Sequence, residues 1–166
     1  MFTRWLKSSS VRGASVLSFT KSLRADGSWA DIDYADDARS RWKTVQHLSR
    51  VHDMALHYRA RGAQDAHSLL HSSILSALHY WVTNDFKNPN WWWNQIGAPR
   101  TMLPILLLLD EELSDSQRKG GLAILKRAKI GMTGQNLVWV TEITAGRGLI
   151  ENDAELVGRA YRRIAD

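Results

Sequence analysis

Three consecutive tryptophans, Trp91, Trp92 and Trp93, stand between two asparagines, Asn90 and Asn94. An indole ring offers a broad flat face on which a ring-shaped ligand can stack. Successive residues of a helix point about 100° apart, so three neighbouring side chains cannot all enter one core. At least one of the three is therefore predicted to lie at the surface or to line a groove. Core packing between helix ends is the alternative for the others.

Asn136 closes a short loop, Thr133-Gly134-Gln135-Asn136, and precedes a helical pattern. Asparagine is well suited to the N-cap position of a helix. The N-terminus of a helix also favours a nearby anion. A capping role and contact with an anionic group are therefore compatible interpretations of Asn136.

His67, His71 and His79 fall on one helical stripe. An i, i+4 pair of imidazoles can bind a metal ion, but no acidic or cysteine ligand joins them on that face. We predict a solvated or partly packed flank, with no metal site and no cofactor.

His47 and Arg50 lie one helical turn apart, and we expect them to brace their helix, in part against the aspartate-rich stretch 31–37. A catalytic role for His47 is the alternative. The order of aspartates in 26–37 does not match an EF-hand, which needs a glutamate at its twelfth position, so turns and helix caps explain them better.

Apolar residues recur with helical spacing almost throughout the chain, and β-branched alternation is nearly absent. Helices are expected over residues 37–59, 63–82, 93–110, 114–129, 136–147 and 153–164, after a weakly patterned first segment that ends near residue 24. Short connectors between such helices favour antiparallel hairpins. The prediction is an all-α chain, forming one helical domain over residues 1–166, and both an incomplete α/α toroid and a plain bundle fit it.

Local signals set the helix ends in the second half. Ser114 with Gln117 three residues later forms a capping-box pattern. Gly148 indicates a break between the last two helices. Asn152 or Asp153 is expected to cap the last one, whose predicted apolar face consists of Leu156, Val157, Ala160, Tyr161 and Ile164.

Composition and charge exclude several classes of protein. The chain has no cysteine, which excludes disulfides and thiolate metal sites. A net charge of +5 favours polyanionic partners, either an acidic polysaccharide or nucleic acid. Membrane headgroups are disfavoured because no basic amphipathic helix stands out. The longest apolar run, 103–109, is too short to span a bilayer, and the N-terminus lacks the apolar region of a signal peptide.

Three stretches carry a family resemblance. The first is Asp26 to Tyr34, followed by Trp42 and by 47–50; the second is Asn90 to Arg100; the third is Thr133 to Asn136, continuing to 146–149. In this order they resemble polysaccharide lyase family 8, which includes hyaluronate, chondroitin AC and xanthan lyases. The resemblance runs from about Ser22 to the end. Its most specific part is Asn-Trp-Trp followed by Ile-Gly-x-Pro.

The resemblance implies an incomplete α/α toroid with a long cleft, followed in complete members by β-sandwich domains. It implies β-elimination at a uronic acid residue of an anionic polysaccharide. The block of Asn90, Trp91, Trp92 and Trp93 is then the substrate-binding platform, with Trp93 the member most expected to be structural. Asn136 is the catalytic helper that contacts the uronate carboxylate, where charge develops as the C5 proton leaves. An amide cannot itself act as the general base or acid that the reaction also needs.

The sequence departs from the family at several points. The resemblance implies that a histidine and a tyrosine beyond Asn136 perform the proton transfers, but no histidine follows Asn136 and the one later tyrosine is Tyr161. Trp93 and Trp139 stand where many relatives have smaller or polar residues. We therefore expect part of a longer, secreted or periplasmic and monomeric lyase of chondroitin- or hyaluronan-like polysaccharide, inactive by itself. A non-catalytic glycan-binding module is one alternative. A nucleic-acid-binding domain, which only the net charge favours, is another, and we predict no nucleic-acid and no membrane partner.

Overall fold

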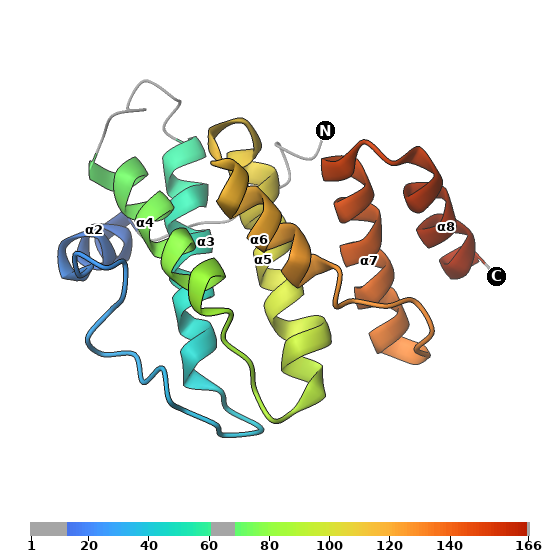
Figure 1. Ribbon diagram of the computed structural model, residues 1–166, viewed down its shortest axis with the longest axis horizontal. Helices are drawn as coiled ribbons and strands as arrows, with labels where there is room; N and C mark the ends of the chain where they lie inside the picture. Colours follow the sequence, from blue (N-terminus) through green and yellow to red (C-terminus); the bar gives the residue numbers. More distant parts are fainter. Residues whose placement is uncertain (1–12, 61–68, 166) are drawn as a thin grey trace. The chain divides into compact units, whose positions relative to one another are not determined.

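A computed structural model describes residues 13–60 and 69–165, and all the elements named within these ranges are helical (Figure 1). No strand forms among them, although one isolated bridge pairs Leu23 with Trp29. The prediction of an all-α chain is confirmed. The start of the helix predicted over residues 63–82 and the position of His67 lie outside the described residues. Backbone contacts divide the chain into two compact units, Met1–Phe86 and Lys87–Asp166, which are described separately.

The first unit is built around two long helices that pack against each other. It contains α2 (Gly13–Ser22), a 3₁₀ turn (Lys43–Val45), α3 (Gln46–Ala60) and α4 (Leu69–Asn84). Residues at the three- and four-residue spacing that predicted these helices are fully or almost fully buried. They are Leu48, Val51 and Ala55 of α3 and Ile74, Ala77, Leu78 and Trp81 of α4.

The helix predicted to begin near residue 37 begins later, at Gln46, after the 3₁₀ turn. Asp36 accounts for the difference. Its carboxylate accepts hydrogen bonds from the backbone N–H of Ala38 at 3.0 Å and of Lys43 at 2.5 Å, and its carbonyl accepts one from the Trp42 indole at 2.9 Å. A carboxylate that captures nearby backbone donors competes with the helix for them, and the segment stays a loop.

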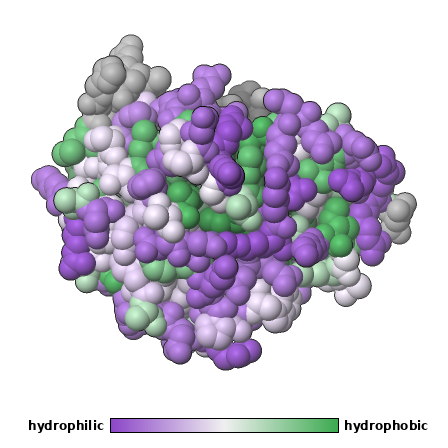
Figure 2. Space-filling model, in the orientation of Figure 1, coloured by the Kyte–Doolittle hydropathy of each residue, from purple (hydrophilic) through white to green (hydrophobic). Residues whose placement is uncertain are grey.

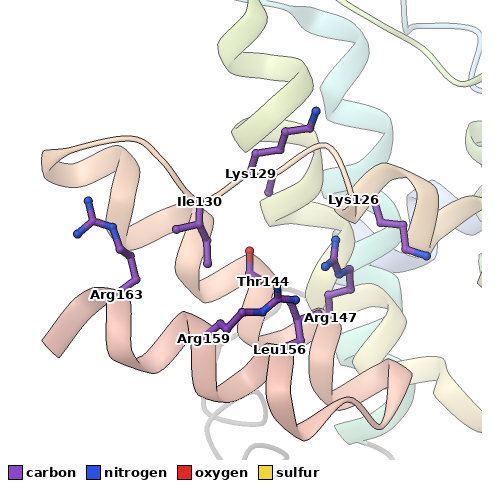
Figure 3. A pocket seen from close by; sticks show the side chains of 9 residues that line it. Lys126, Lys129, Ile130, Thr144, Arg147, Leu156, Arg159 and Arg163 are labelled. Carbon is purple, nitrogen blue, oxygen red and sulfur yellow. The ribbon is translucent and has the colours of Figure 1, made fainter. Parts of the chain in front are cut away.

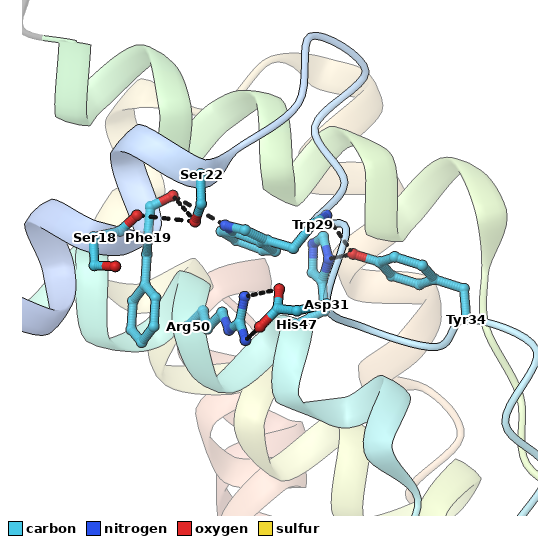
Figure 4. Close-up of polar contacts among 8 residues, drawn as sticks. All are labelled: Ser18, Phe19, Ser22, Trp29, Asp31, Tyr34, His47 and Arg50. Carbon is cyan, nitrogen blue, oxygen red and sulfur yellow. Dashed lines mark hydrogen bonds and ion pairs between the residues drawn. The ribbon is translucent and has the colours of Figure 1, made fainter.

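His47 lies fully buried where α3 meets α4 and the preceding loop (Figure 4). Its Nε2 lies 2.8 Å from the carbonyl oxygen of Ala77, so Nε2 carries the proton. Nδ1 then accepts a hydrogen bond from the Tyr34 hydroxyl at 2.9 Å, and the Tyr34 oxygen accepts one from the backbone N–H of Trp29 at 3.0 Å. Burial lowers the pKa of His47 to about 4 and raises the pKa of Tyr34 to about 12, so both are neutral at pH 7.

Arg50 holds the same loop from the next turn of α3. Its guanidinium bonds both oxygens of Asp31, at 2.9 and 2.5 Å. The guanidinium carbon also lies over the rings of Phe19 and Trp29, 5.0 and 5.3 Å from their centroids. The arginine lowers the pKa of the Asp31 carboxyl. The predicted bracing role of His47 and Arg50 is confirmed.

The second unit is centred on an apolar helix. A π-helical segment (Trp93–Gly97) leads into α5 (Ala98–Leu109) and a 3₁₀ turn (Asp110–Glu112), followed by α6 (Asp115–Leu125), α7 (Gly134–Glu151) and α8 (Ala154–Ala165). Helix α5 packs against α6 and α7, and α7 packs along α8 (Figure 1). The interior side chains of α5 are Met102, Ile105, Leu106 and Leu109, all fully buried.

The predicted capping box at the start of α6 is confirmed. The backbone N–H of Gln117 donates to Ser114 Oγ at 3.3 Å, and the backbone N–H of Ser114 donates to Gln117 Oε1 at 3.0 Å. The helix ends at Leu125, earlier than the predicted end near residue 129.

The predicted helix break at Gly148 is wrong, because α7 continues to Glu151. A Cβ at Gly148 would lie 2.8 Å from Val157 Cγ2 and 3.0 Å from the carbonyl oxygen of Asp153. The glycine therefore allows the start of α8 to approach α7 closely. Asn152 ends α7 in the left-handed conformation, and Asp153 caps α8 by accepting from the N–H of Leu156 at 2.8 Å.

Only part of the predicted apolar face of α8 is buried. Leu156 and Ala160 are covered, whereas Tyr161 and Ile164 are 73% and 55% exposed. Hydrophilic side chains cover most of the face seen in Figure 2, with hydrophobic surface showing between them. Within the described residues, no helix combines the length and apolar character that a membrane crossing requires.

Candidate functional site

Asparagine side chains fix the chain where it enters the tryptophan block. Asn94 clamps the backbone of Asn88 from both sides, accepting from its N–H at 2.9 Å and donating to its carbonyl at 2.7 Å. Asn90 Oδ1 accepts from the backbone N–H of Trp92 at 3.1 Å. Asn90 thus helps to place Trp92 in the first turn of the helix, and its role in substrate binding stays a prediction.

The three tryptophans differ in exposure. Trp91 is 48% exposed, whereas Trp92 and Trp93 are partly buried, so one of the three does lie at the surface as predicted. The rings of Trp92 and Trp93 meet edge to face, with centroids 5.0 Å apart. Trp91 therefore offers an open face, while Trp92 and Trp93 support each other.

The rings of two tryptophans in the block pack directly against Gly97, which explains why a glycine stands at this position. A Cβ at Gly97 would lie 2.5 Å from Trp93 Cε3 and 2.9 Å from Trp92 Cζ3, so any side chain there would displace both rings. The backbone is a π-helix from Trp93 to Gly97, a form found mostly as single turns and often at functional sites. Gly97 and the π turn together hold the two indoles against the helix.

Asn136 occupies the third residue of α7, not its N-cap. The N-cap is Thr133, so the alternative interpretation of Asn136 as a helix cap is wrong, and its predicted contact with a carboxylate stays a prediction. Gly134 at the first position has φ 58°, a left-handed conformation that costs other residues about 1 kcal/mol or more. This requirement gives a physical reason for glycine in the Thr-Gly-x-Asn loop, which turns sharply so that Asn136 lies in the first turn of α7.

Trp92 and Asn136 are in direct contact although 44 positions separate them. The indole Nε1 of Trp92 donates to Asn136 Oδ1 at 3.3 Å. An indole N–H can only donate, so the amide oxygen must face Trp92 and the NH₂ group must point elsewhere. No protein acceptor for that NH₂ occurs among the described residues. The amide therefore presents a donor to whatever lies beside it, at the helix end that favours negative charge.

Two residues that the sequence analysis did not select extend this site. Trp139, one turn further along α7, meets the Trp92 ring edge to face with centroids 5.7 Å apart. The guanidinium carbon of Arg100 lies 5.2 Å from the Trp139 ring centroid, and Arg100 Nε lies 3.2 Å from Glu142 Oε2. Both ends of this ion pair are about half exposed, so it contributes little to stability. The available signals were the position of Arg100 at the end of the Pro-Arg motif and the three-residue spacing of Asn136 and Trp139.

The assembled site, which we call the indole–amide site, consists of Trp91, Trp92, Trp93, Trp139, Asn136 and Arg100. It combines flat apolar rings with an amide donor and a guanidinium cation. Such a set can hold a ring-shaped ligand that carries a carboxylate. Tyr161, the one tyrosine that follows Asn136 in the sequence, is exposed on α8.

The histidines considered for a metal have other contacts. His71 stacks on Tyr58 with ring centroids 5.1 Å apart, and His79 Nε2 lies 3.4 Å from the Thr83 hydroxyl. Within the ranges 13–60 and 69–165, no three His, Cys, Asp or Glu side chains gather in a way that could hold a metal ion.

Comparison with solved structures shows the fold. A chondroitinase AC lyase structure, described from enzyme–oligosaccharide complexes, superposes with a TM-score of 0.85 at 24% identity, covering 97% of this chain and 25% of that one. A Paenibacillus xanthan lyase gives 0.76 at 24% identity, over 98% and 16%. A Streptomyces coelicolor chondroitin AC lyase in complex with chondroitin sulphate gives 0.75 at 18% identity, over 92% and 22%. The all-α fold is therefore of the α/α-toroid type.

Sequence comparison agrees with the structural one. The chondroitinase-AC of Pedobacter heparinus is 33% identical over 91 residues, which is 52% of this chain and 13% of the relative. This chain thus spans a quarter or less of the length of these relatives. A family model described as "Polysaccharide lyase family 8, N terminal alpha-helical domain" matches residues 7–166, and the chain belongs to that family.

Proposed function

We propose that this chain is the substrate-binding part of a polysaccharide lyase that cleaves uronate-containing chains by β-elimination. The observation that carries the proposal is the hydrogen bond from the partly buried Trp92 indole to Asn136 Oδ1, which leaves the amide NH₂ without a protein acceptor among the described residues. In this proposal Trp91 stacks on a sugar ring, and the Asn136 amide donates to the carboxylate of the uronate. Arg100, beside Trp139, adds a cation for a second anionic group.

The chemistry explains why an amide is useful at this position. Base removal of the proton on C5 gives an enolate-like carboxylate, and the C4–O bond then breaks to form a C4–C5 double bond, with a proton delivered to the departing oxygen. A fixed neutral donor stabilises the charge that develops on the carboxylate. Asn136 cannot accept the C5 proton or protonate the leaving oxygen, so these two roles are assigned to no residue of this chain.

A binding experiment on the 166-residue chain tests the proposal. Titration with a chondroitin oligosaccharide of defined length should quench tryptophan fluorescence, and Asn136→Ala should weaken binding by about tenfold, as expected for a lost hydrogen bond to a charged group. The matched control is Asn84→Ala, whose amide donates to the carbonyl of Tyr80 on an exposed part of α4. Equal affinities for the two variants would contradict the proposal.

The reaction products distinguish a lyase from the alternative, a non-catalytic glycan-binding module. A lyase containing this chain should generate ultraviolet-absorbing oligosaccharides with the new C4–C5 double bond, whereas a binding module should leave the polymer intact. We propose action outside the cytoplasm, since polymeric glycans are met there, and cell fractionation would test it. Retention of the protein with the cytoplasmic fraction would contradict that part.

A further inference from the structure

Five cationic side chains of the second unit line one cavity of about 390 Å³ (Figure 3). Lys126 and Lys129 follow the end of α6, Arg147 comes from α7, and Arg159 and Arg163 come from α8. Among the residues that the structure describes, no acidic side chain lines the cavity. We call this cavity the α7–α8 cation pocket.

The positive charge of this pocket is only partly compensated. Among the described residues one carboxylate, Glu151, pairs with the lining cations, at 2.9 Å from Lys126 Nζ and 3.2 Å from Arg147 Nε. The Arg147 Nε is buried and meets Glu151 without the alignment of a hydrogen bond. Lys129, Arg159 and Arg163 form no ion pair with any described carboxylate. Like charges held together repel one another, and an entering anion relieves that repulsion.

The remaining walls indicate what kind of anion fits. Ala128, Ile130 and Leu156 provide apolar surface, and the Thr144 hydroxyl is already engaged with the carbonyl of Val140 at 2.6 Å. Cations over apolar walls suit a ligand whose anionic groups are mounted on a ring framework better than they suit a bare ion. The volume falls within the range of small-molecule sites, and guanidinium groups match the paired oxygens of an oxyanion.

We propose that the α7–α8 cation pocket binds a sugar residue bearing carboxylate or sulfate, as a second contact for the polysaccharide held at the indole–amide site. The inference rests on the proposed function. Asn136 and Arg147 lie eleven residues apart in α7, which is about 16 Å along the helix axis. The stripe of α7 between them is buried at Val140, Ile143 and Thr144, so a glycan that reaches both places must bridge this distance over the neighbouring surface.

The experiment uses the 166-residue chain and three probes at one ionic strength. The probes are a chondroitin sulfate oligosaccharide long enough to span both places, inorganic sulfate, and a single-stranded oligonucleotide of similar charge. The test variant is Arg159→Glu/Arg163→Glu. The matched control is Arg41→Glu/Arg162→Glu, which makes the same charge change at two exposed arginines outside the pocket lining.

The test variant should bind the oligosaccharide at least about tenfold more weakly, as expected for lost charge-assisted hydrogen bonds, and the control should change affinity less than about twofold. Equal losses in both variants would show a general charge effect and overturn the proposal. Tighter binding of inorganic sulfate or of the oligonucleotide than of the oligosaccharide, lost in the test variant alone, would assign the pocket to another ligand and also overturn it. The variant Trp92→Ala separates the two proposals. If only Trp92→Ala weakens binding of the oligosaccharide, the pocket proposal fails and the indole–amide site stands. If only Arg159→Glu/Arg163→Glu weakens binding, the indole–amide proposal fails and the pocket proposal stands.

Discussion

The indole N–H of Trp92 donates to the side-chain oxygen of Asn136 at 3.3 Å, joining the start of the helix that contains Trp92 to the first turn of α7. This bond decides which way the amide faces. Without it, the oxygen and NH₂ of Asn136 could exchange places by rotation about the last side-chain bond, and an outward oxygen would repel a carboxylate.

Trp92→Phe removes the indole donor while keeping an aromatic ring. We expect the affinity for a uronate oligosaccharide to fall by about three- to tenfold, since one hydrogen bond contributes about 1 kcal/mol. Isothermal titration calorimetry measures this change, and the side-chain amide resonances of Asn136 should shift in NMR spectra. Trp91→Phe, which alters no described hydrogen bond to Asn136, is the comparison. A larger NMR shift of Asn136 in Trp91→Phe would refute the orienting role.

Gly97→Ala tests the close approach of the two indoles. The new methyl would lie 2.5 Å from Trp93 Cε3, and we expect overpacking to destabilise the second unit by about 1–3 kcal/mol. Chemical denaturation followed by tryptophan fluorescence measures it. Gly158→Ala is the control: its methyl would meet only the flexible end of Arg162, at 3.2 Å, and alanine favours a helix. Unchanged stability of Gly97→Ala would mean that the rings can move aside freely.

The buried His47 makes the first unit sensitive to acid. Its pKa is about 4 in the folded chain and 6.5 in the reference state, so the unfolded chain binds more protons between these values. Stability from this group is complete above pH 6.5 and is lost as pH falls towards 4, by an amount on the order of 3 kcal/mol. Denaturation midpoints across this range measure the slope. His47→Gln should flatten it, whereas His79→Gln, at an exposed position, should leave it unchanged.

The capping box gives a further test of the second unit. Ser114→Ala removes the hydroxyl that accepts from the Gln117 N–H, and we expect a loss of about 1 kcal/mol. Ser49→Ala, at an exposed position within α3, should be neutral or slightly stabilising. Hydrogen exchange of the first amides of α6 should accelerate only in Ser114→Ala. Equal exchange in both variants would count against the cap.

Local pattern was enough to predict the helices and several of their ends. The spacing of Leu48, Val51 and Ala55 identified α3, and Ser114 with Gln117 marked the start of α6. The wrong helix boundaries came from residues whose contacts are made with other segments of the chain. Gly148 was interpreted as a break because a pattern cannot show that Val157 packs against it, and Asp36 delays α3 through a bond to Lys43 seven residues on.

The indole–amide site was only partly predictable. Trp91, Trp92, Trp93 and Asn136 were selected, but no periodicity relates positions 92 and 136, and only the order of the family motifs suggested that they meet. Trp139 was noted only because many relatives have a smaller or polar residue there, and its contact with Arg100 depends on how α5 lies against α7. Pairings of that kind are set by tertiary packing.

The π turn at Trp93–Gly97 lies between the tryptophan block and the apolar helix α5. It accommodates one more residue than an α turn would, so the aromatic face before it and the apolar face of α5 after it are out of step by one position. A substitution at the exposed Trp91 should therefore change the proposed sugar-binding surface without repacking the apolar interior side of α5. Deleting one residue within the turn should bring the two faces back into phase and rotate the indole rings relative to α5 by about 100°.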